Sequence, residues 1–149
     1  MNRRGVTMIE LLVVVILIGI LANIAVPKFR DVRRRADAAH VIGDFNAIRH
    51  AVFDYYATHN AWPPSGVWAQ PPPALVQHLP GGLDFTYANL RYRYRQWSFP
   101  GGMPGNPSQT SVVGVQILAT DAQTIQAIRG AYRGPEAFSF NLTVTFVIE

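Results

Sequence analysis

The chain has 149 residues, of which 13 are Lys or Arg and 9 are Asp or Glu, so its formal net charge is +4. This length allows one domain of ordinary size with an appendage, and it excludes a large multidomain enzyme. The absence of cysteine excludes a disulfide framework, a thiolate zinc site and a thiol nucleophile. Charged residues make up only 15% of the chain, against roughly 25% in typical soluble domains.

The deficit of charge lies in residues 6–27, which are apolar on every side of a helix. Between residues 11 and 26 there is no charge, and Asn23 is the only strongly polar side chain. A helix over residues 6–27 would be about 33 Å long, enough to cross a hydrocarbon core of ~30 Å. A buried core helix is one alternative, but so small a chain could not surround it. A signal peptide is another, but no A-x-A cleavage site precedes Pro27. The sequence therefore predicts a transmembrane helix.

A specific motif precedes the apolar run, and from residue 3 it reads Arg-Arg-Gly-Val-Thr-Met-Ile-Glu. This arrangement resembles the N-terminus of type IV pilins and type II secretion pseudopilins. The resemblance implies that the basic residues Arg3 and Arg4 belong to a leader. It also implies that prepilin peptidase cuts between Gly5 and Val6, and that Val6 is then N-methylated. Pro27 lies at a depth where that family commonly has a proline.

Glu10 is the one carboxylate in the apolar segment. A charge there costs roughly 2.5–3.5 kcal/mol on insertion scales, so Glu10 is a functional candidate. The alternative is helix capping, since Thr7 and Glu10 fit a capping box and an acid in the first turn complements the helix dipole. The family resemblance implies that Glu10 pairs with the freed amine of a neighbouring subunit's Val6. We therefore expect Thr7, Glu10 and Pro27 to serve assembly.

Residues 28–59 are expected to continue the helix. Pro27 lacks an N–H and disturbs helical bonding, so the helix either ends there or continues with a kink or local melting. Residues 28–35 carry a net charge of +4 and are expected to meet lipid headgroups or water, with inter-subunit salt bridges as the alternative. Residues 36–59 are amphipathic. Their stripe, with steps of three or four residues, consists of Ala38, Val41, Phe45, Ile48, Val52 and Tyr55.

The C-terminal part begins with a proline-rich loop. Asn60 and Pro63 mark the end of the helix, and Trp62-Pro63 resembles the aromatic-proline ending common in pseudopilins. Strands are expected over residues 90–99, 111–119 and 138–148. A helix is expected over residues 121–132, with Asp121 as its N-cap.

Arg91, Arg93 and Arg95 alternate with Tyr92 and Tyr94 in the first of these strands. Basic side chains between aromatic ones occur in single-strand nucleic-acid binders, and some DNA-uptake systems use pilin-like proteins. The preferred interpretation is a strand whose tyrosines pack on the helix and whose arginines face water. Nucleic acid is therefore not expected as a partner, and a DNA-binding pilin-like subunit is kept as an alternative.

No catalytic motif, cofactor motif or metal cluster is recognisable, so we expect no enzyme, cofactor or metal. The predicted fold class is α+β: a long N-terminal helix, half transmembrane and half amphipathic, packed on a small antiparallel sheet as in pilins. The predicted divisions are a leader (1–5), a transmembrane and assembly segment (6–27), an amphipathic continuation (28–60) and a head (61–149).

The expected function is that of a filament subunit, preferably a pseudopilin of a type II secretion-like system, with a major or minor type IV pilin as the alternative. The short head, the missing Cys pair and the Trp62-Pro63 ending favour the pseudopilin. Expected partners are other pilin-like subunits, prepilin peptidase and an inner-membrane assembly platform. The expected location is the bacterial inner membrane, crossed once with the head in the periplasm, and then a periplasmic or surface filament.

Overall fold

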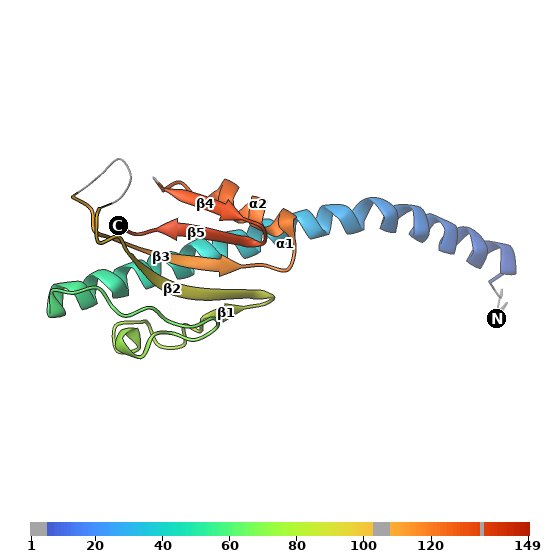
Figure 1. Ribbon diagram of the computed structural model, residues 1–149. Coiled ribbons are helices and arrows are strands. Elements are labelled where there is room, and N and C mark those ends of the chain that lie inside the picture. The colour runs from blue at the N-terminus through green and yellow to red at the C-terminus, as the bar shows by residue number, and fades with distance from the viewer. Residues whose placement is uncertain (1–5, 103–107, 135) are drawn as a thin grey trace.

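The computed structural model describes residues 6–102, 108–134 and 136–149. A single helix, α1 (Met8–His59), runs the length of the molecule, and its second half passes behind an antiparallel sheet (Figure 1). Its first half projects beyond the sheet with no other element beside it (Figure 1). The predicted α+β class, a long N-terminal helix packed on a small antiparallel sheet, is confirmed.

Helix α1 continues through Pro27 without a break in the helix, so the proline does not end it. It ends at Asn60, whose φ of 50° lies in the left-handed region that closes many helices and that Asn tolerates. The predicted apolar stripe is confirmed, with Tyr55 only partly buried. The buried residues of α1 are Ala38, Val41, Phe45, Ile48, Ala51 and Val52.

The sheet contains five antiparallel strands in the order β1-β2-β3-β5-β4. Their bounds are β1 (Thr86–Tyr87), β2 (Leu90–Ser98), β3 (Ser111–Leu118), β4 (Ala137–Phe140) and β5 (Thr143–Val147).

The expectation of one strand over residues 138–148 is wrong, because the chain reverses there and forms the β4–β5 hairpin. Phe140 pairs with Thr143, which leaves a two-residue turn at Asn141 and Leu142. Asn141 takes a φ of 52°, as the tight turns of hairpins require and as Asn permits.

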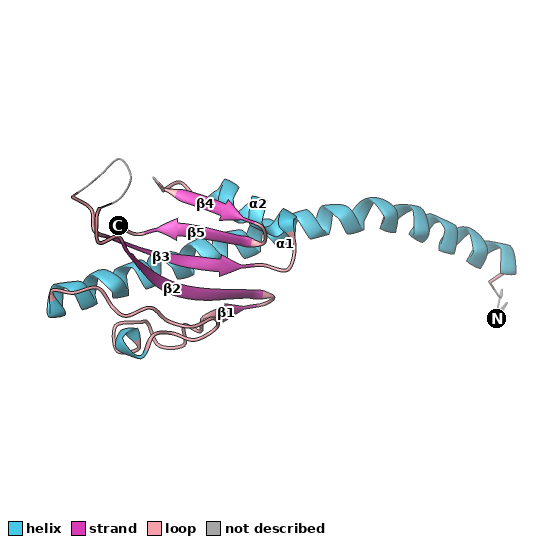
Figure 2. Ribbon diagram, viewed as in Figure 1, coloured by secondary structure: helices cyan, strands magenta, loops and turns pink. Residues whose placement is uncertain are grey.

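Both helices lie on one face of the sheet, which we call the inner face (Figure 2). Helix α2 (Ala122–Ala131) follows β3 and begins at Asp121, the N-cap that was predicted. Between the helices and the sheet lies the core, where each large side chain contributes about 1.5–3 kcal/mol by burial. Its largest members from the sheet and α2 are Tyr92, Tyr94, Ile117, Ile128 and Phe146. No helix of the described chain covers the opposite face, which we call the outer face (Figure 2).

The proline-rich segment runs along the free edge of β2 and contains a short 3-10 helix, η1 (Pro73–Leu75). The backbone N–H of Gly66 donates to the carbonyl of Tyr94 at 3.0 Å, and that of Ala69 to Tyr92 at 2.9 Å. These bonds satisfy part of an edge that would otherwise be open to pairing with another chain.

Candidate assembly site

The start of α1 is closed by Thr7 and Glu10. The hydroxyl of Thr7 accepts a hydrogen bond from the backbone N–H of Glu10 at 3.3 Å. The Glu10 carboxylate accepts one from the backbone N–H of Thr7 at 3.4 Å, which completes a capping box. Both residues are exposed, and no cation of the described chain pairs with the Glu10 carboxylate. Glu10 therefore caps its own helix and retains an uncompensated negative charge.

The first half of α1 presents an apolar surface in every direction. Every residue from 6 to 33 is exposed, and the most hydrophobic 18-residue window has no buried residue at all. Helix α1 is long and apolar enough to cross a membrane. Such a surface is stable only in lipid or against other apolar helices, because water would have to solvate it.

Pro27 and Asn23 alter the hydrogen bonding within the apolar half of α1. Pro27 has no N–H to donate to the carbonyl of Asn23, so one backbone hydrogen bond of the helix is missing. The side-chain amide of Asn23 donates to the carbonyl of Gly19 at 3.2 Å. The polar side chain is thereby satisfied within its own helix, which lowers the cost of placing it in lipid.

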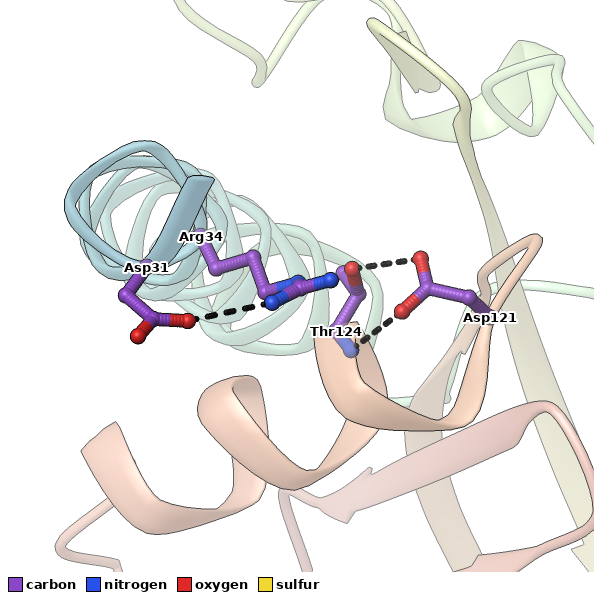
Figure 3. A network of polar contacts seen from close by, with 4 residues as sticks. All are labelled: Asp31, Arg34, Asp121 and Thr124. Carbon is purple, nitrogen blue, oxygen red and sulfur yellow. Dashed lines mark hydrogen bonds and ion pairs between the residues drawn. The ribbon is translucent and has the colours of Figure 1, made fainter. Parts of the chain in front are cut away.

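A polar network marks the point where α1 enters the head (Figure 3). Arg34 pairs with Asp31 at 3.1 Å, and its side chain extends toward Thr124 on the first turn of α2 (Figure 3). Asp121 accepts hydrogen bonds from the Thr124 hydroxyl at 2.7 Å and from its backbone N–H at 2.9 Å. These two bonds hold the pKa of Asp121 below its usual range, and the positive charge of Arg34 adds to the effect. Arg34 thus lies between an acid of α1 and the capped end of α2.

The three alternating arginines of β2 point to the outer face, while Tyr92 and Tyr94 are buried against the helix, as the preferred interpretation required. Arg91 and Arg95 are exposed. Arg93 is half-buried, donates to the side-chain oxygen of Gln116, and lies over the ring of Trp68 at 4.3 Å. Sequence reasoning did not anticipate Trp68, which reaches Arg93 only because the loop runs beside β2.

Three residues of the predicted processing site, Arg3, Arg4 and Gly5, lie outside the described residues. Val6 is described and is 67% exposed. Within residues 6–102, 108–134 and 136–149, no three His, Asp or Glu side chains gather in a way that could hold a metal ion.

Comparison with known proteins matches this N-terminal segment to a described motif and to several relatives. Residues 1–25 match the prokaryotic N-terminal methylation motif. The chain is 38% identical over 68 residues to the type IV major pilin protein PilE1 of Neisseria gonorrhoeae, covering 44% of this chain and 32% of that one. It is 38% identical over 61 residues to a fimbrial protein of Neisseria meningitidis, covering 41% and 36%.

A relative from a distant bacterium matches over a shorter stretch. The chain is 45% identical over 51 residues to the type IV narrow pilus major component PilA5 of Thermus thermophilus, covering 34% of this chain and 44% of that one. The chain thus spans between 32% and 44% of the length of the three relatives named. No solved structure matches it significantly.

The fold and the N-terminal segment define a protein with a projecting apolar helix and a small α+β head. Its N-terminal segment carries the prokaryotic N-terminal methylation motif, and the first part of the chain is similar to type IV major pilins.

Proposed function

We propose that this chain is a structural subunit of a type IV pilus or a closely related filament, and not an enzyme. The observation that carries the proposal is the projecting half of α1, which is apolar on all sides and begins with a prepilin-type motif. Such a helix can exchange lipid for the helices of neighbouring subunits, because both surroundings cover apolar surface.

The relatives support one type of filament over the other. The three named above are components of type IV pili or fimbriae, so they favour the type IV pilin over the pseudopilin of type II secretion that the sequence suggested. The preference for a pseudopilin depended on the short head, the missing Cys pair and the Trp62-Pro63 ending, and these do not outweigh this similarity.

Processing and location complete the proposal. Prepilin peptidase would cut between Gly5 and Val6, and Val6 would be N-methylated. Residues 6–27 would then hold the subunit in the inner membrane with its head in the periplasm, until an assembly platform extracts it. Glu10 supports this scheme, because its charge has no partner in the described chain and so is available to the freed amine of another subunit's Val6.

Co-expression of the full chain with a prepilin peptidase tests the proposal. Mass spectrometry should show the loss of residues 1–5 and the gain of one methyl group. Gly5→Val should abolish the cut. Gly19→Val is the matched control, because a side chain added at Gly19 meets nothing within 4 Å, and this variant should be cut normally. A chain that stays uncut in the presence of an active peptidase would refute the proposal.

A further inference from the structure

The outward-facing side chains of β2 to β5 carry positive charge and aromatic rings. The side chains that define the outer face here are Arg91, Arg93, Arg95, Trp97, Phe138 and Phe140. All outward-facing side chains of β2 to β5 lie in the described part of the chain, and none of them is Asp or Glu. No acid within these four strands therefore neutralises the positive charge of β2.

The arginines of β2 are available to an anion from outside. Arg91 and Arg95 have no anionic partner among the described residues. Arg93 is tied to the neutral side chain of Gln116, which leaves its charge uncompensated. Partial burial lowers the pKa of Arg93, and the nearby charge of Arg95 lowers it further, which shows that like charges are held close together. A polyanion would relieve this repulsion.

The aromatic rings of this face are placed for stacking. A side chain at Gly114 would come within 3.3 Å of the Trp97 ring, so the indole lies close to the sheet where a glycine leaves room for it. The guanidinium of Arg95 lies over that ring at 5.6 Å. At the other edge, Phe138 and Phe140 are 53% and 76% exposed, although apolar rings in a strand are usually covered.

The distance between the arginines of β2 and the rings of β4 favours an extended ligand. Phe138 and Phe140 lie on the same side of β4, two residues or roughly 6.8 Å apart. The arginines of β2 and the rings of β4 are separated by three strand intervals, roughly 14 Å. A small anion would meet only one of these groups, whereas a polymer with alternating charges and flat rings would meet both.

We infer that the outer face binds single-stranded nucleic acid, with Arg91 and Arg95 contacting phosphates and Trp97, Phe138 and Phe140 stacking on bases. Stacking on aromatic rings combined with a basic surface is the common basis of single-strand binding without sequence preference. An acidic peptide would use the arginines but leave the exposed rings without a partner. The inference depends on the head alone and does not rest on the proposed role in a filament.

The test uses the full chain in detergent micelles and a short fluorescein-labelled oligothymidylate, with fluorescence anisotropy measured over a range of salt concentrations. Arg91→Gln with Arg95→Gln should weaken binding at least tenfold. It should also reduce the slope of log K against log salt by roughly 1.4, since each phosphate contact to a single strand contributes about 0.7. Arg35→Gln with Arg49→Gln removes the same charge from exposed positions on α1 and should leave binding unchanged.

A second pair of substitutions separates stacking from charge. Phe138→Ala with Phe140→Ala should weaken binding roughly tenfold for each base that stacks and leave the salt slope unchanged. In the unaltered chain, the oligonucleotide should quench tryptophan fluorescence, a measurement that needs no variant. Duplex DNA and polyglutamate are the competing ligands, and both should bind more weakly. Absence of binding at low salt, equal binding of polyglutamate, or insensitivity to both pairs of substitutions would overturn the inference.

Discussion

Replacement of Glu10 by Gln separates the two roles that this carboxylate can have. A Gln carboxamide oxygen can accept the backbone N–H of Thr7 as the carboxylate does at 3.4 Å, so Glu10→Gln retains the cap and removes only the charge. Thr7→Ala makes the opposite change. It removes the hydroxyl that accepts from the N–H of Glu10, and it leaves the charge in place.

The magnitudes predict opposite outcomes for the two variants. Loss of the cap costs about 1 kcal/mol and frays only the first turn of a 52-residue helix. A charge costs roughly 2.5–3.5 kcal/mol at the centre of a spanning helix and less near its end, where Glu10 lies. Because Glu10→Gln lowers this cost, the variant cannot fail by losing its anchor. We therefore expect Glu10→Gln to be processed and held in the membrane but absent from filaments. We expect Thr7→Ala to assemble, which would limit the role of Thr7 to the cap, against the sequence-based expectation that it serves assembly.

The assay compares sheared filaments with the membrane fraction of the same cells by immunoblot, and mass spectrometry confirms that each variant is processed. Asp84→Asn serves as a control for the loss of an exposed acid in the head and should assemble normally. If Glu10→Gln enters filaments at the level of the unaltered chain, the charge has no part in assembly and Glu10 is only a cap.

Three further predictions concern the head. Asp121→Ala should destabilise it by about 1 kcal/mol through loss of the α2 cap. Hydrogen bonds from Thr124 lower the pKa of Asp121 in the folded head below the usual value of 3.8. The stability that the Asp121 cap contributes is therefore complete above pH 3.8 and is lost as the pH falls through the lowered pKa of the folded state. The difference in urea midpoint between the unaltered chain and the variant should accordingly shrink below pH 3.8. Gly114→Ala should lower Tm, at a cost of about 1–3 kcal/mol, because the new methyl group would lie 2.7 Å from the carbonyl oxygen of Phe146. Ile48→Ala, at a position that is 0% exposed, should cost about 2–5 kcal/mol in denaturant unfolding, and a smaller loss would mean that α1 is not the centre of the core.

The parts of the fold that could be predicted are those whose signal is local. The stripe of α1 repeats with the helical period over several turns, so Phe45 and Ile48 could be assigned to the core from the sequence. The β4–β5 hairpin was missed because apolar and polar residues alternate straight through the turn, and neither Gly nor Pro interrupts them. Only Asn141 marks the turn, and a single Asn is a weak turn signal.

The candidate functional sites also divide into those with a local sequence signal and those formed only by the fold. The processing motif and the capping box are contiguous in the chain, so Gly5, Val6 and Glu10 could be proposed as site residues from the sequence, and their roles stay predictions. The outer face is not contiguous, because Trp97 and Phe138 come to one surface only through the pairing of β2, β3, β5 and β4. Strand order and register depend on long-range packing, which a single sequence does not display.

The contact between Phe45 and Phe146 also determines when the head can fold. Their rings lie 5.1 Å apart, and the ring of Tyr132 stacks on Phe146 at 4.1 Å. Phe146 belongs to β5, far along the chain from α1, so the apolar stripe of α1 stays uncovered until β5 has been synthesised. Contacts between residues so far apart in the sequence form slowly, since a long loop must close first. The nascent chain therefore passes through a stage in which α1 has been synthesised while the core that covers its apolar stripe is still open.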